Sequence, residues 1–542
     1  MAGGLGCFDE KQSDFVRNSR RSNFVELVRK LRQREEDNNP VRVGIIGCGQ
    51  MGSGLAHATS CIAGMRVVAI ADIDSERAIR TFLELRRRHG QDARATDLRR
   101  HGQDARATDH GQDARATGHG QDDRATDLRR HGQEARAGSP CYKRDDVVLT
   151  ENAGKAQDAL NAGKVVVTAD AQLLTGLEGI EANVEATGVP DVGAFVAWSS
   201  IKNNKPIVML NVETDVTVGA YLNHLARKAG SIYTVASGDE PGVCKMLYEQ
   251  AVLMGFEVVC LGKGKNNPIN HYMTPEMCAE EAASKRMNPK MLTSFIDGTK
   301  TMVEMAAVSN ATGLLPDVPG MHGPKVEINE LAKTFIPKAD GGILNVARPS
   351  WPCLHGLEAR ATCRGAVDYS TGAVAPGVFA IVYSGDKRMR WDMKLITKAE
   401  GPYYLHYRPY HLCDLETPQS VAEAVLLGEV TIASEKMNSE VVAVAKRNIR
   451  AGEKVKGIGS ADIYGIIYTY KEARAKKAIP IGIADKGTVK KNIPKGGGLT
   501  KDNFAPDTTT FVYRLRKEQD AFCSAKLRKA ELVDSKHRPR TN

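Results

Sequence analysis

The stretch Val41-Arg-Val-Gly-Ile-Ile-Gly-Cys-Gly-Gln-Met-Gly52 decides the fold of the first half of the chain. An apolar run rich in β-branched residues ends in the pattern Gly-x-Gly-x-x-Gly, and a helix-compatible segment follows it. A second apolar run, Met65–Ala71, ends at Asp72, about twenty residues after the last glycine. This order of strand, glycines, helix, strand and acid predicts a dinucleotide-binding unit.

Each glycine of this pattern has a physical role in binding a dinucleotide. Gly47 permits the tight turn, Gly49 lets the backbone approach a pyrophosphate, and Gly52 lets the helix pack close to the strand. The pyrophosphate would lie at the helix N-terminus, beside Gln50 and Met51, where unpaired N–H groups and the helix dipole favour an anion. We therefore predict that these five residues bind a nicotinamide or flavin dinucleotide.

Asp72 bears on which dinucleotide is bound. A carboxylate at the end of the second strand accepts hydrogen bonds from the adenosine ribose hydroxyls and repels a 2′-phosphate, which favours NAD. Arg77 and Arg80 follow closely, and either could pair with a phosphate, so NADP stays open.

Composition indicates a globular protein of several domains. The 542 residues are enough for two to four domains, and 42% hydrophobic with 26% charged residues is ordinary for a soluble chain. No apolar run reaches eighteen residues, and residues 1–40 are polar without an apolar signal-peptide core. The eleven cysteines lack any Cys-x-x-Cys pair. We expect a cytoplasmic protein with reduced thiols and no membrane partner.

The net charge of +10 arises mainly in two peripheral segments. Residues 86–137 carry 12 arginines against 9 acids, and residues 514–542 carry 9 basic against 4 acidic groups, which gives +3 and +5. The remaining body is close to neutral, so we expect no nucleic-acid partner.

The word His-Gly-Gln-Asp-Ala-Arg-Ala-Thr begins at His89 and recurs with small changes at residues 101, 110, 119 and 131; a degenerate copy begins at His355. These units contain almost no apolar residue larger than alanine and cannot bury a core, so they predict disorder or a solvated helix. Nothing preorganises the five histidines for a metal. We interpret residues 88–140 and 347–364 as translated mobile repeats inserted outside the fold.

Apart from the first insert, strand-like and helix-like segments alternate up to residue 235. Strands are expected at residues 164–168, 182–186 and 206–210, with a helix at 217–229. The pattern predicts a Rossmann-type, doubly wound parallel sheet, whose ligands bind beyond the carboxyl ends of the strands. Thr187, Gly188 and Asn211 follow two such ends and are further cofactor candidates.

Polar residues then gather in loop-like contexts between 236 and 440. The segment Gly262–Pro268 follows a strand expected at 257–261 and supplies Lys263, Lys265, Asn266 and Asn267. Two ammonium groups and two amides on a flexible turn suit a phosphate or a developing alkoxide, although a solvated basic turn is equally compatible with the pattern.

Helical spacing places four polar residues on one face. Asp297, Lys300, Thr301 and Glu304 recur at i, i+3, i+4 and i+7 beside apolar neighbours. An active-site face and a solvent-exposed stripe of ion pairs are both consistent with this pattern.

Short alternating strands from about residue 440 predict a compact β module, followed by a charged tail that is helical to about residue 532. The expected division of the chain is an N-terminal helical or flexible segment 1–40, a nucleotide-binding domain 41–235, an α+β catalytic domain 236–440, a β module 441–520 and a charged tail 521–542.

Five blocks closely resemble the 1-deoxy-D-xylulose 5-phosphate reductoisomerase-like proteins, which have a homoserine-dehydrogenase-like amino-terminal architecture. The blocks are residues 238–242, 262–268, 295–306, 321–324 and 408–412. Members often carry a C-terminal SAF (β-clip) domain, and residues 444–453 resemble the start of one. The resemblance implies NADPH-dependent reduction coupled to rearrangement of a ketose phosphate, as in isoprenoid biosynthesis, and a homo-oligomer.

We assign roles to the polar residues of these blocks on that basis. Lys263 or Lys265 would transfer the proton at the carbonyl or hydroxyl, because a desolvated lysine beside a second cation has a lowered pKa. Carboxylates would orient hydroxyls or hold a divalent metal. The catalytic set is Lys263, Lys265, Asp239, Glu240, Asp297 and Lys300; the metal candidates are Asp239, Glu240, Asp297 and Glu304; the substrate contacts are Asn266, Asn267, His322, Arg408 and His411.

Two other functions are compatible with the sequence. A homoserine dehydrogenase would share the fold and hydride chemistry, but its substrate lacks the phosphate that the cationic and amide groups favour. A dinucleotide-sensing scaffold that binds a partner through its β module would not be an enzyme at all.

Overall fold

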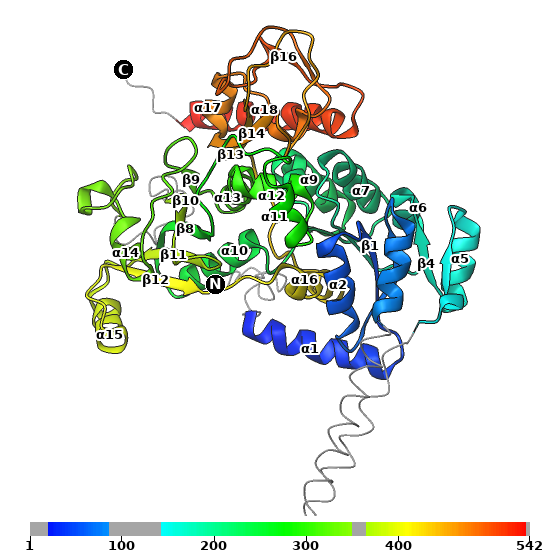
Figure 1. The fold of residues 1–542 in the computed structure, drawn as a ribbon. Helices are drawn as coiled ribbons and strands as arrows, with labels where there is room; N and C mark the ends of the chain where they lie inside the picture. The colour runs from blue at the N-terminus through cyan, green and yellow to red at the C-terminus, as the bar shows by residue number, and fades with distance from the viewer. Residues whose placement is uncertain (1–19, 86–141, 350–364, 538–542) are drawn as a thin grey trace, which may run out of the picture.

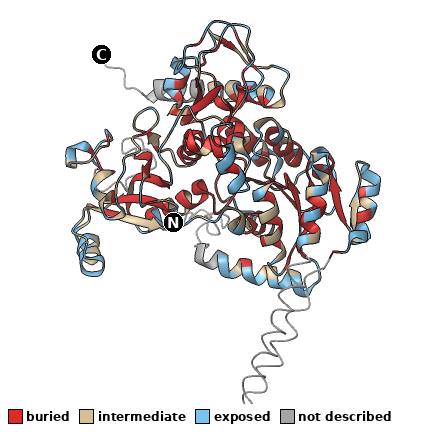
Figure 2. Cartoon of the chain, viewed as in Figure 1, coloured by how far each residue is buried: buried red, intermediate tan, exposed pale blue. Residues whose placement is uncertain are grey.

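The computed structural model describes residues 20–85, 142–349 and 365–537 (Figure 1). The expectations for residues 88–140, and for nearly all of 347–364, lie outside the described residues. Buried residues concentrate in the two larger sheets and the helices that cover them (Figure 2). In the described part of the chain, no helix combines the length and apolarity needed to cross a bilayer.

The first sheet has seven strands in the order β3-β4-β2-β1-β5-β6-β7, and every neighbouring pair is parallel. The strands are β1 (Val41–Ile46), β2 (Met65–Ala71), β3 (Val147–Leu149), β4 (Val165–Thr168), β5 (Ala182–Glu185), β6 (Ile207–Met209) and β7 (Tyr233–Val235). The order reverses direction at β1, so a crevice opens there at the carboxyl edge. The predicted doubly wound parallel sheet is confirmed.

Helices cover both faces of this sheet. They are α2 (Gln50–Ser60), a helix over residues 75–85, α5 (Ala153–Asn161), α6 (Ala171–Gly176), α7 (Pro190–Lys202) and α9 (Ala220–Ala229), and α1 (Arg20–Glu36) lies along one end. Because side chains alternate along a strand, Ile45 packs into one core and Ile46 into the other. Both cores are continuous and apolar. Packing on both faces holds the strands in place, and with them the carboxyl ends after which the cofactor candidates lie.

A later segment returns to this first domain. Helix α16 (Cys413–Ala422) lies beside α2 (Figure 1), and its Val421 belongs to the same core as Leu55. The backbone N–H of Val235 then donates to the carbonyl of Ile432 at 2.8 Å. The nucleotide-binding domain is therefore discontinuous in sequence and includes residues 413–432.

The second sheet has five strands in the order β12-β11-β8-β10-β9. They are β8 (Glu257–Lys265), β9 (Leu315–Pro316), β10 (Ala366–Thr371), β11 (Val378–Tyr383) and β12 (Tyr403–Arg408). Helices α10 (Glu240–Leu253) and α13 (Thr299–Thr312) pack on one face, and residues 326–346 cover the other with Phe335 and Leu344. Alternation along β11 sends Ala380 to the helical face and Phe379 to the opposite one.

The C-terminal module is built on an antiparallel pair, β13 (Ser439–Ala445) and β14 (Ile463–Thr469), with the short pair β15 (Thr488–Val489) and β16 (Phe504–Ala505). Helix α18 (Phe511–His537) follows and packs against α7, where the rings of Phe511 and Phe195 meet edge to face at 5.3 Å. The buried guanidinium of Arg516 pairs with Glu440 and fixes this helix to the module.

Candidate functional site

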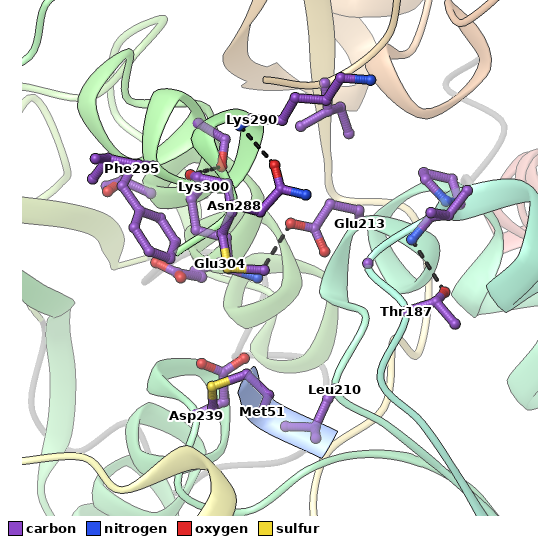
Figure 3. Close-up of a pocket in the computed structure, with 18 of the residues that line it drawn as sticks. Met51, Thr187, Leu210, Glu213, Asp239, Asn288, Lys290, Phe295, Lys300 and Glu304 are labelled. Carbon is purple, nitrogen blue, oxygen red and sulfur yellow. Dashed lines mark hydrogen bonds and ion pairs between the residues drawn. The ribbon is translucent and has the colours of Figure 1, made fainter. Parts of the chain in front are cut away.

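A cavity of about 950 Å³ lies where the three parts of the molecule meet. Its walls are the carboxyl edge of the first sheet, the ends of β8 and α10, the first turns of α13, and loops 457–458 and 481–486 of the C-terminal module. Figure 3 shows Met51, Thr187 and Leu210 from the first domain facing Lys300 and Glu304 across this space.

The glycine turn after β1 is tightly packed at two positions and open at the third. A Cβ on Gly52 would lie 1.9 Å from the carbonyl oxygen of Gly47, and Gly47 itself has a φ of +92° against Ala186. A Cβ on Gly49 would meet no atom within 4 Å. Only Gly49 therefore leaves room for a ligand to approach the backbone, as a pyrophosphate at the N-terminus of α2 requires.

Asp72 supports this turn through hydrogen bonds to its backbone. Its Oδ2 accepts a hydrogen bond from the backbone N–H of Cys48 at 2.5 Å, and its Oδ1 accepts from Asp74 N–H and from the Arg77 guanidinium, both at 2.8 Å. The carboxylate is buried whereas the guanidinium is partly exposed. Asp72 and Arg77, the acid and the arginine expected to bear on the choice between NAD and NADP, thus form an ion pair with each other.

The loop after β5 forms the next part of the wall. Thr187 and Gly188 line the cavity, and Thr187 donates to the buried carboxyl of Glu185, whose pKa burial raises to about 7. Asn211 lies outside the cavity lining; its Nδ2 donates to the carbonyl of Val189 at 3.1 Å. Asn211 therefore holds the loop after β5 in place but does not itself line the cavity.

The segment 262–265 is strand, and the predicted loop at these residues is wrong. Strand β8 continues to Lys265 because β10 and β11 flank it on both sides, pairing Lys263 with Tyr369 and with Val378. Alternation puts Lys263 and Lys265 on the same face, toward the cavity. Gly264 lies on the other face, where a Cβ would meet the backbone of Ala375 at 2.2 Å.

Lys263 is locked between two buried carboxylates. Its ammonium group donates to both Glu240 and Glu304. Burial lowers the pKa of Lys263, but the two carboxylates outweigh this and hold the pKa well above its ordinary value. Of the two lysines expected to share a lowered pKa, Lys263 therefore does not have one, because two carboxylates contact its ammonium group.

Lys265 has the opposite environment. Its ammonium group donates to Asn267 Oδ1 at 3.0 Å and to the carbonyl of Phe295 at 2.7 Å, both uncharged acceptors. Burial and the neighbouring charge of Lys263 lower the pKa of Lys265 to about 8. Of the two candidate lysines, only Lys265 has the lowered pKa that proton transfer near neutral pH requires.

Helix α13 links the two domains across the cavity. Lys300 pairs at 3.2 Å with Glu213, which follows the carboxyl end of β6, and the charges of Glu213 and Asp239 raise the pKa of Lys300 against the effect of burial (Figure 3). Asp239 precedes α10, and burial together with the charge of Glu240 raises its pKa well above the usual range. Glu213 was not predicted from the sequence, although it follows a strand end as Asn211 does.

His411, just before α16, and Cys413, its first residue, approach the same carboxylates. His411 Nδ1 lies 2.8 Å from the carbonyl oxygen of Pro376, and its Nε2 lies 3.4 Å from Glu240 Oε1. Cys413 Sγ lies 3.4 Å from Asp239 Oδ1. Cys413 was not predicted as a site residue, although it stands two residues after a predicted one.

Asp297 does not belong to this group. It precedes α13, separated from it by Gly298 in the left-handed conformation, so the predicted four-residue helical face does not include it. Its carboxylate is fully buried and pairs at 2.8 Å with Lys446 of the C-terminal module, while accepting from Thr299 N–H. Asp297 therefore fixes the module to the catalytic domain, away from the cavity lining.

His322 and Arg408 also lie elsewhere. His322 Nδ1 is 2.8 Å from the buried carboxylate of Asp368, which raises the pKa of His322. Arg408 forms a two-pronged ion pair with Glu416. Neither side chain lines the cavity, and neither is placed to contact a substrate there. Asn266 and Asn267 do line it, next to Lys265.

The predicted metal set is only partly assembled. Asp239, Glu240 and Glu304 offer oxygen atoms within 4.8 Å of one another, whereas Asp297 is absent from the group. The Lys263 ammonium already bridges Glu240 and Glu304. Lys263 therefore already supplies a cation to Glu240 and Glu304, at the place where a metal ion would bridge them.

The parallel sheet, the glycine turn at its carboxyl edge and the adjoining polar cavity define a dinucleotide-binding protein of the Rossmann class. Residues 238–417 match the family model described as oxidoreductase DRL, catalytic domain. The fold and this match together make the chain an NAD(P)-dependent oxidoreductase.

Solved structures similar to this chain include a probable dehydrogenase from Thermotoga maritima, at 12% identity over 72% of this chain and 90% of that one, with a TM-score of 0.33. Another is 1-deoxy-D-xylulose 5-phosphate reductoisomerase from Zymomonas mobilis in complex with NADPH, at 13% identity over 49% of this chain and 57% of that one, with a TM-score of 0.27. None of the curated proteins compared matches the sequence.

Proposed function

We propose that the protein reduces the carbonyl group of a phosphorylated ketose with NAD(P)H, as a reductoisomerase of the 1-deoxy-D-xylulose 5-phosphate or branched polyol phosphate type. The observation that carries the proposal is Lys265, a buried lysine with a pKa of about 8 in the cavity that also contains the cofactor edge. The bound dinucleotide supplies the hydride. Lys265 supplies the proton that the carbonyl oxygen needs as the C=O double bond becomes an alcohol.

The remaining polar groups support binding of a polyol chain. Glu240 and Glu304 are held in place by Lys263, so their outer oxygens can accept hydrogen bonds from substrate hydroxyls without moving. Lys300, fixed by Glu213, places a second cation near the developing negative charge. In this assignment Lys263 is a positioning residue, and the proton is transferred by Lys265.

The cavity offers lysine side chains to a phosphate. Lys265, Lys285, Lys290 and Lys486 line it together with Asn266 and Asn267. Lys285 pairs with Glu281, whereas Lys290 and Lys486 form no ion pair with any described residue. Lys486 comes from the C-terminal module, which we assign to the SAF type on its sequence resemblance. Two lysines without a carboxylate partner among the described residues favour a doubly charged anion over the amino-acid head group of homoserine.

Cofactor choice depends on the pair of Asp72 and Arg77. The carboxylate favours NAD by accepting from ribose hydroxyls, while the guanidinium is exposed enough to reach a 2′-phosphate. We propose that both cofactors bind. Replacing Arg77 by alanine should weaken NADPH binding and leave NADH binding nearly unchanged, which fluorescence titration of each reduced cofactor measures.

The proposal is tested by following oxidation of NADPH and NADH with a panel of ketopentose phosphates, the same sugars without phosphate, and homoserine. We expect turnover only with phosphorylated ketoses. Turnover of homoserine alone would make the protein a homoserine dehydrogenase. Cofactor binding without hydride transfer to any compound in the panel would instead favour the sensing scaffold.

A further inference from the structure

We propose that Glu185 positions the wall of the cofactor site and that its carboxyl group takes up a proton when the dinucleotide binds. Glu185 is the last residue of β5, and its neighbour in β1 is Ile46, which precedes the glycine turn. The side chain is fully buried, and residues 186–189 of the loop that follows it line the cavity. Only cofactor binding is involved, so the proposed substrate plays no part.

Glu185 holds this loop through Thr187. Its Oε1 atom accepts hydrogen bonds from the Thr187 backbone N–H at 2.9 Å and from the Thr187 hydroxyl. The hydroxyl oxygen in turn accepts from the backbone N–H of Val189 at 3.2 Å. A Cβ on Gly47 would lie 2.9 Å from the backbone of Ala186 and Thr187, so the loop packs directly on the glycine turn. A shift of Thr187 would therefore disturb the turn that a pyrophosphate approaches.

The other carboxyl oxygen of Glu185 lacks a donor. Oε2 is shielded from solvent, and no described residue completes a hydrogen bond to it. The amide of Asn211 donates to the carbonyl of Val189 instead, at 3.1 Å. A Cβ on Gly193 would lie 3.0 Å from Oε2, so α7 closes this side of the carboxyl group. A buried carboxylate with one oxygen unpaired is unfavourable, whereas the neutral acid carries a proton of its own.

The surroundings of Glu185 also lack a cation. No described lysine or arginine forms an ion pair with it. On α8 (Val212–Thr214), Glu213 adds a like charge and itself pairs with Lys300. Tyr233 on β7 stays neutral, because burial and the charge of Asp215 raise its pKa well above the usual range. The uncharged neighbours from β1, β6 and α7 are Ile46, Met209 and Gly193.

Glu185 therefore changes charge near neutral pH. Burial raises its pKa to about 7, although the hydrogen bonds from Thr187 act in the opposite direction. The pyrophosphate of the cofactor brings negative charge to the glycine turn and favours the neutral acid. At a separation of about 10 Å and an effective dielectric constant of about 20, this repulsion weakens binding to the ionised form about tenfold. The cofactor Kd should be constant below about pH 6 and rise as Glu185 ionises.

The test measures NADH binding to the full-length chain by isothermal titration calorimetry from pH 5.5 to 9. Each pH is covered in two buffers of different ionisation enthalpy, so the difference in heat counts the protons taken up. A tenfold effect on affinity corresponds to an uptake of at most about half a proton per cofactor, between about pH 7 and 8. Glu185→Gln keeps an acceptor for Thr187 but cannot titrate. It should bind NADH as tightly as wild-type protein at pH 6 and lose this uptake.

Glu185→Ala separates the positioning role from the titration. It removes the acceptor for Thr187 and should weaken NADH binding at every pH, including pH 6, where Glu185→Gln binds normally. Lys265 also titrates in the cavity, with a pKa of about 8, and it is unchanged in both variants. The difference in proton uptake between wild-type protein and Glu185→Gln is therefore the contribution of Glu185 alone.

Asp215→Asn is the matched control. Asp215 is a buried carboxyl group of the same domain, and burial raises its pKa to about 6, but it lies outside the cavity lining. Its oxygens accept from Tyr233 at 3.0 Å and Ser434 at 2.9 Å. This variant should leave the proton uptake between pH 7 and 8 unchanged.

Thr187→Val gives a second test that does not depend on folding of Glu185→Gln. It removes a donor that stabilises the charged carboxylate, so the midpoint of the rise in Kd should move to higher pH. Thermal unfolding shows which variants fold. Wild-type proton uptake in folded Glu185→Gln, an unchanged midpoint in folded Thr187→Val, or no uptake by wild-type protein between pH 7 and 8 would each overturn the proposal.

Discussion

Two lysines of one strand, Lys263 and Lys265, point into the same cavity and differ in their charged neighbours. Lys263 faces two carboxylates, whereas Lys265 contacts only neutral oxygens at hydrogen-bond distance. An ion pair fixes a lysine in its charged form, while burial without a counter-charge favours the neutral form. The same residue type therefore has a positioning role at one position and a proton-transfer role two residues later.

The first prediction concerns the pH dependence set by Lys265. Burial and Lys263 lower its pKa to about 8, with Glu304 and Asp297 acting in the opposite direction. The ammonium form donates the proton in reduction, so kcat for reduction should be constant below about pH 8 and fall above it, while oxidation of the product alcohol should rise. Lys265→Ala should lower kcat about 10²–10⁴-fold, with cofactor affinity retained. Steady-state kinetics from pH 6 to 10 measure both effects, and an unchanged profile in Lys265→Ala would contradict the assignment.

The second prediction concerns stability and Lys263. Replacing it with methionine keeps the volume but leaves Glu240 and Glu304 buried without their cation. Breaking a buried ion pair from one side costs about 3–5 kcal/mol. Lys263→Met should therefore lower the free energy of unfolding by that amount in urea at neutral pH, whereas the partly exposed Lys285→Met should change it little. Equal stability of the two variants would show that the carboxylates relax or become protonated at no cost.

At the residue scale, the sequence predicted which charged residues gather at the cavity better than it predicted which residues form ion pairs with each other. Lys263, Lys265, Asp239, Glu240, Lys300 and Glu304 do meet at one cavity. Asp297, His322 and Arg408 bind Lys446, Asp368 and Glu416 instead, because each of these charges finds a closer partner on another element. Such pairings join residues 8 to 149 positions apart, and no local pattern contains them.

At the scale of elements, the turn between β1 and α2 gives the third prediction. Gly49→Ala adds a methyl group that meets no protein atom, while Gly52→Ala places one 1.9 Å from a backbone oxygen. Gly49→Ala should keep the wild-type melting temperature and lose cofactor affinity, since the methyl group occupies the space a pyrophosphate needs. Gly52→Ala should lower the melting temperature as well. Calorimetry and cofactor titration separate the two, and equal loss of stability would argue against the open position at Gly49.

The strands of the first sheet were predictable because each is a short apolar run bounded by turn residues. The expected ranges 164–168, 182–186 and 206–210 differ from β4, β5 and β6 by at most one residue at either end. Strand β8 was not predictable to its end, since Gly-Lys-Gly-Lys has low β propensity. Pairing with β10 and β11 on both sides overrides that propensity.

At the scale of the whole molecule, the repeat segment gives the fourth prediction. Residues 88–140 connect a helix that ends near residue 85 to Tyr142, which packs against Phe82 with ring centroids 5.3 Å apart. The chain on either side is therefore held by the body of the protein. Closing a loop of doubled length costs only about 0.6 kcal/mol, so deleting residues 88–140 should leave the melting temperature and cofactor affinity nearly unchanged. A fall of either would mean that the repeat packs on the body.

The return of residues 413–432 to the first domain has a consequence for synthesis of the protein. Val41 opens the first sheet, and the partner of its last strand, Ile432, leaves the ribosome 391 residues later. At about 5–20 residues per second, that interval is about 20–80 s. During this time the surface of Leu55 that Val421 later covers stays in contact with water or a chaperone. The nascent domain thus remains incomplete until its catalytic neighbour has been made, and translation order couples the maturation of the two.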